Sequence, residues 1–213
     1  MTQALVGYND HGIILATDSR ATRFDEQGQS HYFSVEKLFP LGTLAAVLSG
    51  GSGVSVPLSL ALRHEVDQRR LVEIEAIIGF ALPFLSQAYG RYLAQHGPEP
   101  EDLRRIYFIL AGYAPQLQAP AYHVSLLASE NNALPLERIP VQPLMVMPRH
   151  LGMEMRLMTA LRQGVPLAEL LELSREFLAK RAAATQEVAP PFYFATITPE
   201  GYQPVILPNP VLG

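Results

Sequence analysis

The sequence predicts an α+β fold in which two largely antiparallel sheets stack face to face, each with a layer of helices on its outer side. The main observation is the order of the elements: strands, two helices, strands, two helices, strands. A parallel α/β fold would instead alternate strictly between strand and helix. A second observation is that residues 43–48 are nearly all apolar, which is typical of a strand buried on both faces. Two sheets between two helical layers satisfy both observations.

The first strands are predicted from short runs of branched and aliphatic residues. Residues 4–8 and 12–17 are such runs, and the residues between them have the types found in tight turns. Residues 31–38 mix apolar and polar positions and form a second pair with residues 43–48. We therefore expect four strands before the first helix.

Helical spacing of apolar residues begins after the glycine-rich segment 49–53. It covers about 55–70 and 73–95, with Pro83 as a kink inside the second helix. The remaining expected elements are strands at 106–111 and 121–127, a possible strand at 144–147 in the proline-broken segment 135–148, helices at 151–162 and 167–178, and strands at 192–197 and 202–207.

Composition favours a single compact domain over residues 1–213, because 48% of the 213 residues are hydrophobic and 17% are charged. The absence of cysteine excludes disulfides, thiolate metal sites and a cysteine nucleophile. A net charge of −4 gives no electrostatic footprint for nucleic acid or anionic membranes. The sequence has no uninterrupted membrane-length apolar run and no secretory signal, so we expect a cytoplasmic protein that binds neither membrane nor nucleic acid.

Two further kinds of site are disfavoured. The six histidines are scattered without helical pairing, so we expect no metal site. Residues 49–53 lack the lysine and the spacing of a phosphate-binding loop, so we interpret them as a turn from strand to helix. No cofactor is predicted.

Four segments near the N-terminus carry a resemblance to a known family. They are TQALVG at 2–7, HGIILATDSRAT at 11–22, VEKLF at 35–39 and AVLSGG at 46–51. In order and nearly in spacing, they resemble the start of mature proteasome β subunits, which are N-terminal nucleophile (Ntn) hydrolases. The resemblance is close over residues 2–53, looser over 106–127, and returns at 192–201. It implies the four-layer αββα fold, in agreement with the order of elements.

The resemblance implies a threonine-type peptidase whose nucleophile is Thr2, exposed as the first residue after removal of Met1. A free α-amine has a pKa near 8 and can take the proton of the hydroxyl on the same residue. Lys37 would stabilise negative charge, Asp18 would hold Lys37, and the Gly50 N–H would face the oxyanion.

The same resemblance assigns residues that contact the substrate. Arg20 would order the site, and the main chain of Thr22 would pair with an extended peptide by strand addition. A pocket for an apolar side chain is assigned to Ala21, Val35, Phe39 and Leu48.

Two positions depart from the family pattern and open an alternative function. Active β subunits carry a Ser-Gly-Ser turn before the third helix, whereas this chain has Met147-Pro148-Arg149-His150. Thr185 and Val188 stand where the family has an aspartate and a serine. His150 or Glu187 are candidates to replace the missing groups in a proton relay. The alternative is a non-catalytic structural or binding subunit with a degraded outer part of the catalytic site.

Family resemblance also implies partners. The expected substrate is a peptide or an unfolded polypeptide, and the expected assembly is a homo-oligomeric ring that encloses its sites. The apolar helices at 55–95 and the methionine-rich segment 145–158 are candidate interfaces. The chain has no ATP-binding motif, so unfolding of folded substrates would need a separate ATPase.

The apolar pocket predicts a cleavage preference. Reporter peptides with leucine before the cut should be hydrolysed about tenfold faster than matched peptides with aspartate or lysine there, because burying a charge in an apolar pocket is costly. Comparing kcat/KM across the three reporters measures the preference. Faster cleavage of the charged reporters would contradict the predicted pocket.

Overall fold

The computed structural model describes residues 2–25, 27–98, 104–115, 121–141 and 143–208, and the chain divides into two compact units. The first unit contains Met1–Lys37, Gln142–Thr196 and Gln203–Gly213, and the second contains Leu38–Val141 and Ile197–Tyr202. The chain therefore passes between the units several times. The expectation of one domain over 1–213 stays a prediction.

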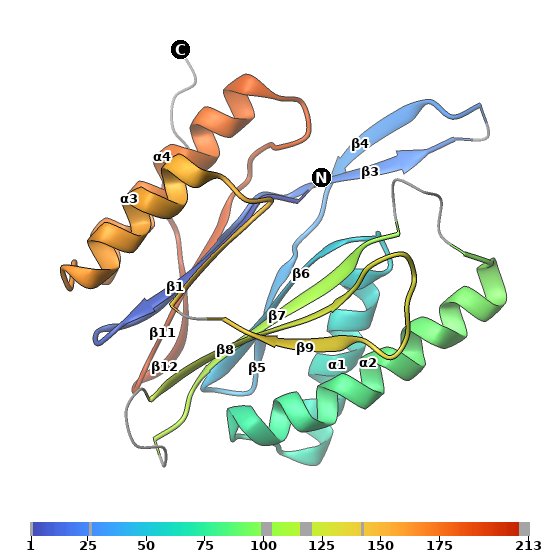
Figure 1. Ribbon diagram of the computed structural model, residues 1–213, viewed down its shortest axis with the longest axis horizontal. Coiled ribbons are helices and arrows are strands. Elements are labelled where there is room, and N and C mark those ends of the chain that lie inside the picture. The colour runs from blue at the N-terminus through green and yellow to red at the C-terminus, as the bar shows by residue number, and fades with distance from the viewer. Residues whose placement is uncertain (1, 26, 99–103, 116–120, 142, 209–213) are drawn as a thin grey trace. The chain divides into compact units, whose positions relative to one another are not determined.

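The first unit is built mostly on a sheet with the strand order β10-β1-β2-β11-β12 (Figure 1), although the end of β11 and the start of β12 fall within Ile197–Tyr202 of the second unit. β1 pairs antiparallel with both β10 and β2, so that Ala4 lies between Met147 and Thr17. This register places residues 2 and 3 beside the end of β2, where Asp18 follows. The strands are β1 (Ala4–Asn9), β2 (Gly12–Thr17), β10 (Leu144–Met147), β11 (Tyr193–Thr198) and β12 (Gly201–Val205).

Two helices, α3 (Leu151–Arg162) and α4 (Leu167–Ala184), pack on one face of this sheet. Their apolar residues, among them Leu157 and Leu178, form a core with Leu5 and Ile14 of the sheet. The residues that alternate with these along β1 and β2 point to the opposite face and are also fully buried: Ala4, Val6, Ile13 and Leu15. The sheet is thus buried on both faces at its centre.

The second unit contains a sheet of five strands in sequence order, β5-β6-β7-β8-β9, with every neighbouring pair antiparallel. The helices α1 (Ser55–Arg69) and α2 (Ile74–His96) pack against it and build a core around Leu62, Ile77 and Phe108 (Figure 1). The strands are β5 (Leu38–Leu41), β6 (Ala45–Gly51), β7 (Ile106–Tyr113), β8 (Tyr122–Ser129) and β9 (Glu137–Pro140).

The predicted helices are confirmed, including the bounds of α3, and so are the antiparallel pairing and the strand at 144–147. The prediction of four strands before the first helix is wrong, because the described residues form six strands there. The predicted strand at 31–38 divides into β4 (Ser30–Ser34) and β5, and β3 (Arg20–Phe24) was not predicted. β3 and β4 form a two-stranded hairpin in which β4 is exposed along its whole length, so neither strand carries an alternating apolar pattern.

The strand β9 was also missed, because it lies in the proline-broken segment. All four of its residues are exposed, and it pairs with β8 at the end of the strand order. An exposed edge strand tolerates proline and polar residues, so its sequence shows no hydrophobic pattern.

Among the described residues, no helix is both long enough and apolar enough to cross a membrane. The stacking of the two sheets stays a prediction.

Gly51 lies at the end of β6, and we expect its substitution to destabilise the protein far more than substitution of the nearby Gly53. Its φ of +84° disfavours other residues, and an added Cβ would lie 2.0 Å from the carbonyl oxygen of Arg105. Gly51→Ala should therefore lower the free energy of unfolding by at least about 2 kcal/mol, measured by urea denaturation.

Gly53→Ala is the matched control, because nothing lies within 4 Å of an added Cβ there. Its effect should stay within about 0.5 to 1 kcal/mol. Equal stability of the two variants would show that the turn after β6 is not constrained in this way.

Candidate functional site

The carboxylate of Asp18 lies immediately after β2 and has no solvent exposure. Its Oδ1 accepts hydrogen bonds from the Gln3 backbone N–H at 2.9 Å and from the Lys37 ammonium at 3.1 Å. Its Oδ2 accepts from the Arg20 backbone N–H at 2.8 Å. All three neighbours are donors, so the acceptor they require is the ionised carboxylate. The Asp18 carboxylate therefore connects Gln3, the segment 18–20 and Lys37, which are far apart in the sequence.

Lys37 is the other half of this buried pair, and its side chain is only 3% exposed. Besides Asp18, its Nζ donates to the carbonyl oxygen of Arg20 at 2.6 Å. Burial lowers the pKa of Lys37, although the Asp18 carboxylate acts in the opposite direction. Burial likewise raises the pKa of Asp18, opposed by Lys37 and by the backbone donors. The site thus holds a desolvated ammonium whose proton is easier to lose than in water.

Thr2 precedes β1 and is 7% exposed. The next residue, Gln3, is fixed by two backbone hydrogen bonds, because its N–H donates to the Asp18 side chain and its carbonyl accepts from the Asp18 N–H at 3.2 Å. The Gln3 side chain donates to the carbonyls of Met147 and Pro148. The peptide unit that follows Thr2 is therefore held directly on the Asp18 carboxylate. The predicted removal of Met1 concerns a residue outside the described ones.

The segment 147–150, which the resemblance aligns with a serine turn, makes hydrogen bonds that hold Gln3 and the start of α3. Its carbonyls at Met147 and Pro148 hold the Gln3 side chain. The ring of His150 accepts the Met153 N–H through Nδ1 and so caps the N-terminus of α3. Its ring also lies edge-on to Phe177, with 4.9 Å between centroids. His150 is thus engaged in capping and packing, which gives it a structural reason to be present without a proton relay.

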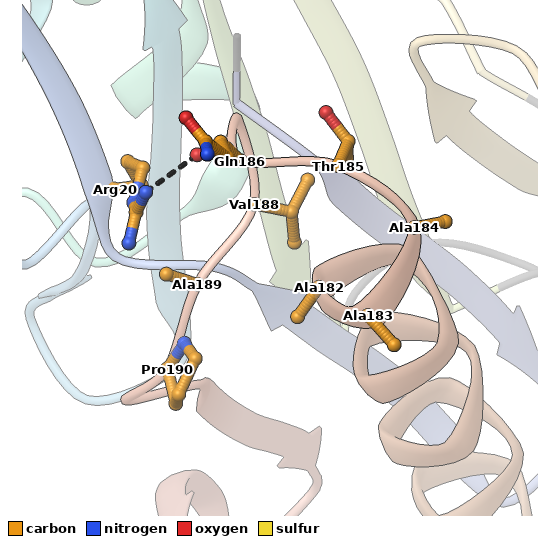
Figure 2. Close-up of a pocket in the computed structure, with 9 residues that line it drawn as sticks. All are labelled: Arg20, Ala182, Ala183, Ala184, Thr185, Gln186, Val188, Ala189 and Pro190. Atoms are coloured by element: carbon orange, nitrogen blue, oxygen red, sulfur yellow. Dashed lines mark hydrogen bonds between the residues drawn. The ribbon is translucent and has the colours of Figure 1, made fainter. Parts of the chain in front are cut away.

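The loop after α4 is attached to the segment that follows Asp18. The N–H and the hydroxyl of Ser19 both donate to the carbonyl of Ala189, each at 3.2 Å. Arg20 donates from Nη1 to the carbonyl of Gln186 at 2.6 Å, the contact drawn in Figure 2. Sequence reasoning singled out Arg20 but missed Ser19, and it had no signal for the carbonyls of Ala189 and Gln186, since any residue type supplies a carbonyl.

Thr185 and Val188 both line the hollow shown in Figure 2. Thr185 ends α4 as its C-cap, and its hydroxyl accepts the backbone N–H of Glu187 at 3.2 Å. Val188 is buried, whereas Glu187 is exposed. The position assigned to the family's serine is therefore occupied by an apolar side chain that packs and cannot donate a hydrogen bond.

The remaining predicted residues fall into two groups. Ala21 and Thr22 are half-buried on β3, where they pair with Phe33 and Tyr32. Val35, in the same unit, donates its N–H to the carbonyl of Ser19 at 2.8 Å. The structure thus brings these three residues into the segment around Asp18 and Arg20.

The other group lies on the sheet of the second unit. Gly50 is buried on β6 opposite Tyr107, and Leu48 is fully buried opposite Leu38 and Ile109. Phe39 packs in the core formed by α1 and α2 and is 5% exposed. Their roles at the oxyanion and in an apolar pocket stay predictions.

No group of three or more histidine, aspartate or glutamate side chains is arranged to hold a metal ion in the described part of the chain. Neither a scan against protein-family models nor a search of curated proteins found a match for this chain. The geometry around Thr2, Asp18 and Lys37 and the resemblance of residues 2–53 are the observations that bear on function.

Removing the Lys37 ammonium should destabilise the protein strongly. Lys37→Met leaves the Asp18 carboxylate buried without its counter-ion, a change that costs about 3 to 5 kcal/mol. Urea denaturation of the variant and the wild type measures the difference in the free energy of unfolding.

The sequence offers a matched control, because Lys180 is the other lysine of the chain and is exposed on α4. Lys180→Met should change stability by no more than about 0.5 kcal/mol. Similar small effects of both substitutions would show that the buried pair contributes little.

Proposed function

We propose that this chain is a threonine-type amide hydrolase, acting on peptides or unfolded polypeptides through Thr2 once Met1 has been removed. The observation that carries the proposal is the buried ion pair of Asp18 and Lys37, which is bonded through Asp18 to the peptide unit directly after Thr2. A buried charge pair is costly to form, and the chain places one of its two lysines there. Such groups are concentrated at functional sites.

The chemistry follows from the residue types. The Thr2 Oγ attacks the carbonyl carbon of an amide, and the free α-amine of Thr2 takes the hydroxyl proton. The C–N bond then breaks, the amine leaves with that proton, and an acyl ester on Thr2 remains. Water cleaves the ester and restores the hydroxyl. The Lys37 ammonium favours the neutral form of the α-amine and stabilises negative charge that develops at the nucleophile.

The four-layer αββα arrangement is part of the proposal. It is supported within each unit, because helices cover one face of the sheet while residues on the other face are fully buried, for example Val6 and Leu15 in the first unit and Ala46 and Leu48 in the second. A homo-oligomeric ring and a separate ATPase are proposed on the resemblance alone.

A second candidate is a non-catalytic subunit with the same fold. It is favoured by His150, which caps α3, and by Val188, which is buried where the family has a serine. With the His150 ring engaged in capping and no polar side chain at Val188, the proton transfers at Thr2 lose hydrogen-bonding support. The two candidates differ in whether Thr2 reacts.

A covalent probe tests the reaction. The purified protein with a free Thr2 amine, verified by intact mass, is incubated with a peptide β-lactone, which acylates a hydroxyl by ring opening. We expect a mass increase equal to the whole probe, located on Thr2 by fragmentation. Thr2→Ala should abolish the labelling and lower amide hydrolysis by about a thousandfold or more, because no nucleophile remains.

Thr159→Ala is the matched control, since Thr159 is an exposed helical threonine whose hydroxyl bonds to the carbonyl of Met155. This variant should be labelled at the wild-type rate. A wild-type protein with a free Thr2 amine that shows neither labelling nor hydrolysis would overturn the enzymatic proposal in favour of the non-catalytic subunit.

A further inference from the structure

The C-terminal end of α4 and the loop that follows it form a hollow of about 380 Å³ beside Arg20 (Figure 2). Its walls are mostly small: Ala182, Ala183 and Ala184 come from the last turn of the helix, and Ala189 and Pro190 from the loop. The loop is anchored by the Ser19 and Arg20 hydrogen bonds described above. The hollow is therefore a shaped surface on an anchored backbone.

Arg20 is the one charged residue among those that line the hollow. Its Nη1 donates to the Gln186 carbonyl, and its guanidinium carbon lies 4.7 Å from the centroid of the Tyr32 ring. These two contacts fix the plane of the guanidinium. In the described part of the chain it forms no ion pair, whereas six other arginines pair with glutamates, for example Arg138 with Glu75 at 2.9 Å.

A fixed guanidinium without a counter-ion favours an anion, and its parallel N–H groups match a planar carboxylate best. The end of α4 also lines the hollow, and its charge is opposite in sign to that of Arg20. The last carbonyls of a helix have no N–H partner within the helix and carry partial negative charge, so they accept N–H donors and disfavour a dianion. A ligand with peptide N–H groups next to a carboxylate can bind both the Arg20 guanidinium and the carbonyls at the end of α4. Phosphate can bind only the guanidinium.

We propose that this hollow is a subsite for a carboxylate carried by a peptide, either the side chain of an acidic residue or the C-terminal carboxylate. The peptide character of the ligand rests on the proposed function, while the carboxylate is inferred from Arg20 and the hollow themselves. The cleavage preference predicted from the sequence assigns an apolar side chain to the residue before the cut, so the carboxylate belongs to another position of the same peptide.

The test is a binding measurement in the Thr2→Ala background, where no peptide is consumed. Three peptides of four residues are compared: acetyl-Ala-Leu-Asp-Ala amide, its neutral isostere acetyl-Ala-Leu-Asn-Ala amide, and the asparagine peptide with a free C-terminal carboxylate. Calorimetry gives their Kd values, and inorganic phosphate serves as a fourth ligand. We expect one or both carboxylate peptides to bind about tenfold tighter than the isosteric neutral amide, with the advantage shrinking in high salt, and phosphate to bind no tighter than that amide.

Variants at Arg20 locate the effect. Arg20→Gln should remove the advantage of the carboxylate, and Arg20→Lys should keep part of it, because lysine retains the charge without the paired N–H groups. Arg23→Gln, an exposed arginine on the same strand, should leave the advantage unchanged. Thermal unfolding of each variant checks that the fold is kept, and if Arg20→Gln is unfolded the lysine variant carries the comparison.

Equal Kd values for all three peptides, tighter binding of phosphate, or a carboxylate advantage that is undiminished in folded Arg20→Gln or in Arg20→Lys would each overturn the subsite. These outcomes are separate from the labelling of Thr2. A protein that binds the carboxylate peptides without cleaving them would keep the subsite and lose only the proposed hydrolase activity.

Discussion

The arrangement of the first unit depends on the buried ion pair between Asp18 and Lys37. Asp18 accepts hydrogen bonds from the residue before β1, from the residue that begins β3, and from the lysine that precedes β5. A carboxylate that has lost its water must have all its acceptor positions filled, so these three segments cannot move apart without a large cost in free energy. The same contact that organises the fold therefore also fixes the backbone beside Thr2.

This coupling extends to the loop after α4. Ser19 and Arg20 follow Asp18 directly and hold the carbonyls of Ala189 and Gln186. One short stretch of chain thus positions the candidate nucleophile on one side and the wall of the hollow on the other. A reaction at Thr2 and recognition of a carboxylate at Arg20 would share the same rigid support, which is a physical reason to consider them parts of one site. Side chains held by packing and hydrogen bonds keep their geometry during a reaction.

Much of the fold was accessible from the pattern of apolar residues. The four helices and the buried strands were predicted because each has one or two buried faces, and burial leaves a periodic trace in the sequence. β3 and β9 were missed because their residues are half-buried or exposed, which imposes no regular apolar period, and β4 was merged with β5 into one predicted strand. In the candidate site, the charged residues Asp18, Lys37 and Arg20 were named through the family resemblance. Ser19, the carbonyl of Ala189 that accepts its hydrogen bonds, and the carbonyl of Gln186 that accepts from Arg20 were not named, because any residue type supplies a backbone carbonyl.

By itself, the sequence determined the order of strands and helices, the absence of cysteine chemistry, and which residues are candidates for a reaction. Those properties are local, since they depend on residue type and on spacing over a few positions. Only the tertiary structure decided that Lys37 and Asp18 bury their charges against each other across 19 residues of chain, that His150 caps a helix, and that Arg20 faces a hollow without an acidic partner among the described residues. Contacts between residues far apart in the chain depend on the packing of whole elements, which no local pattern contains.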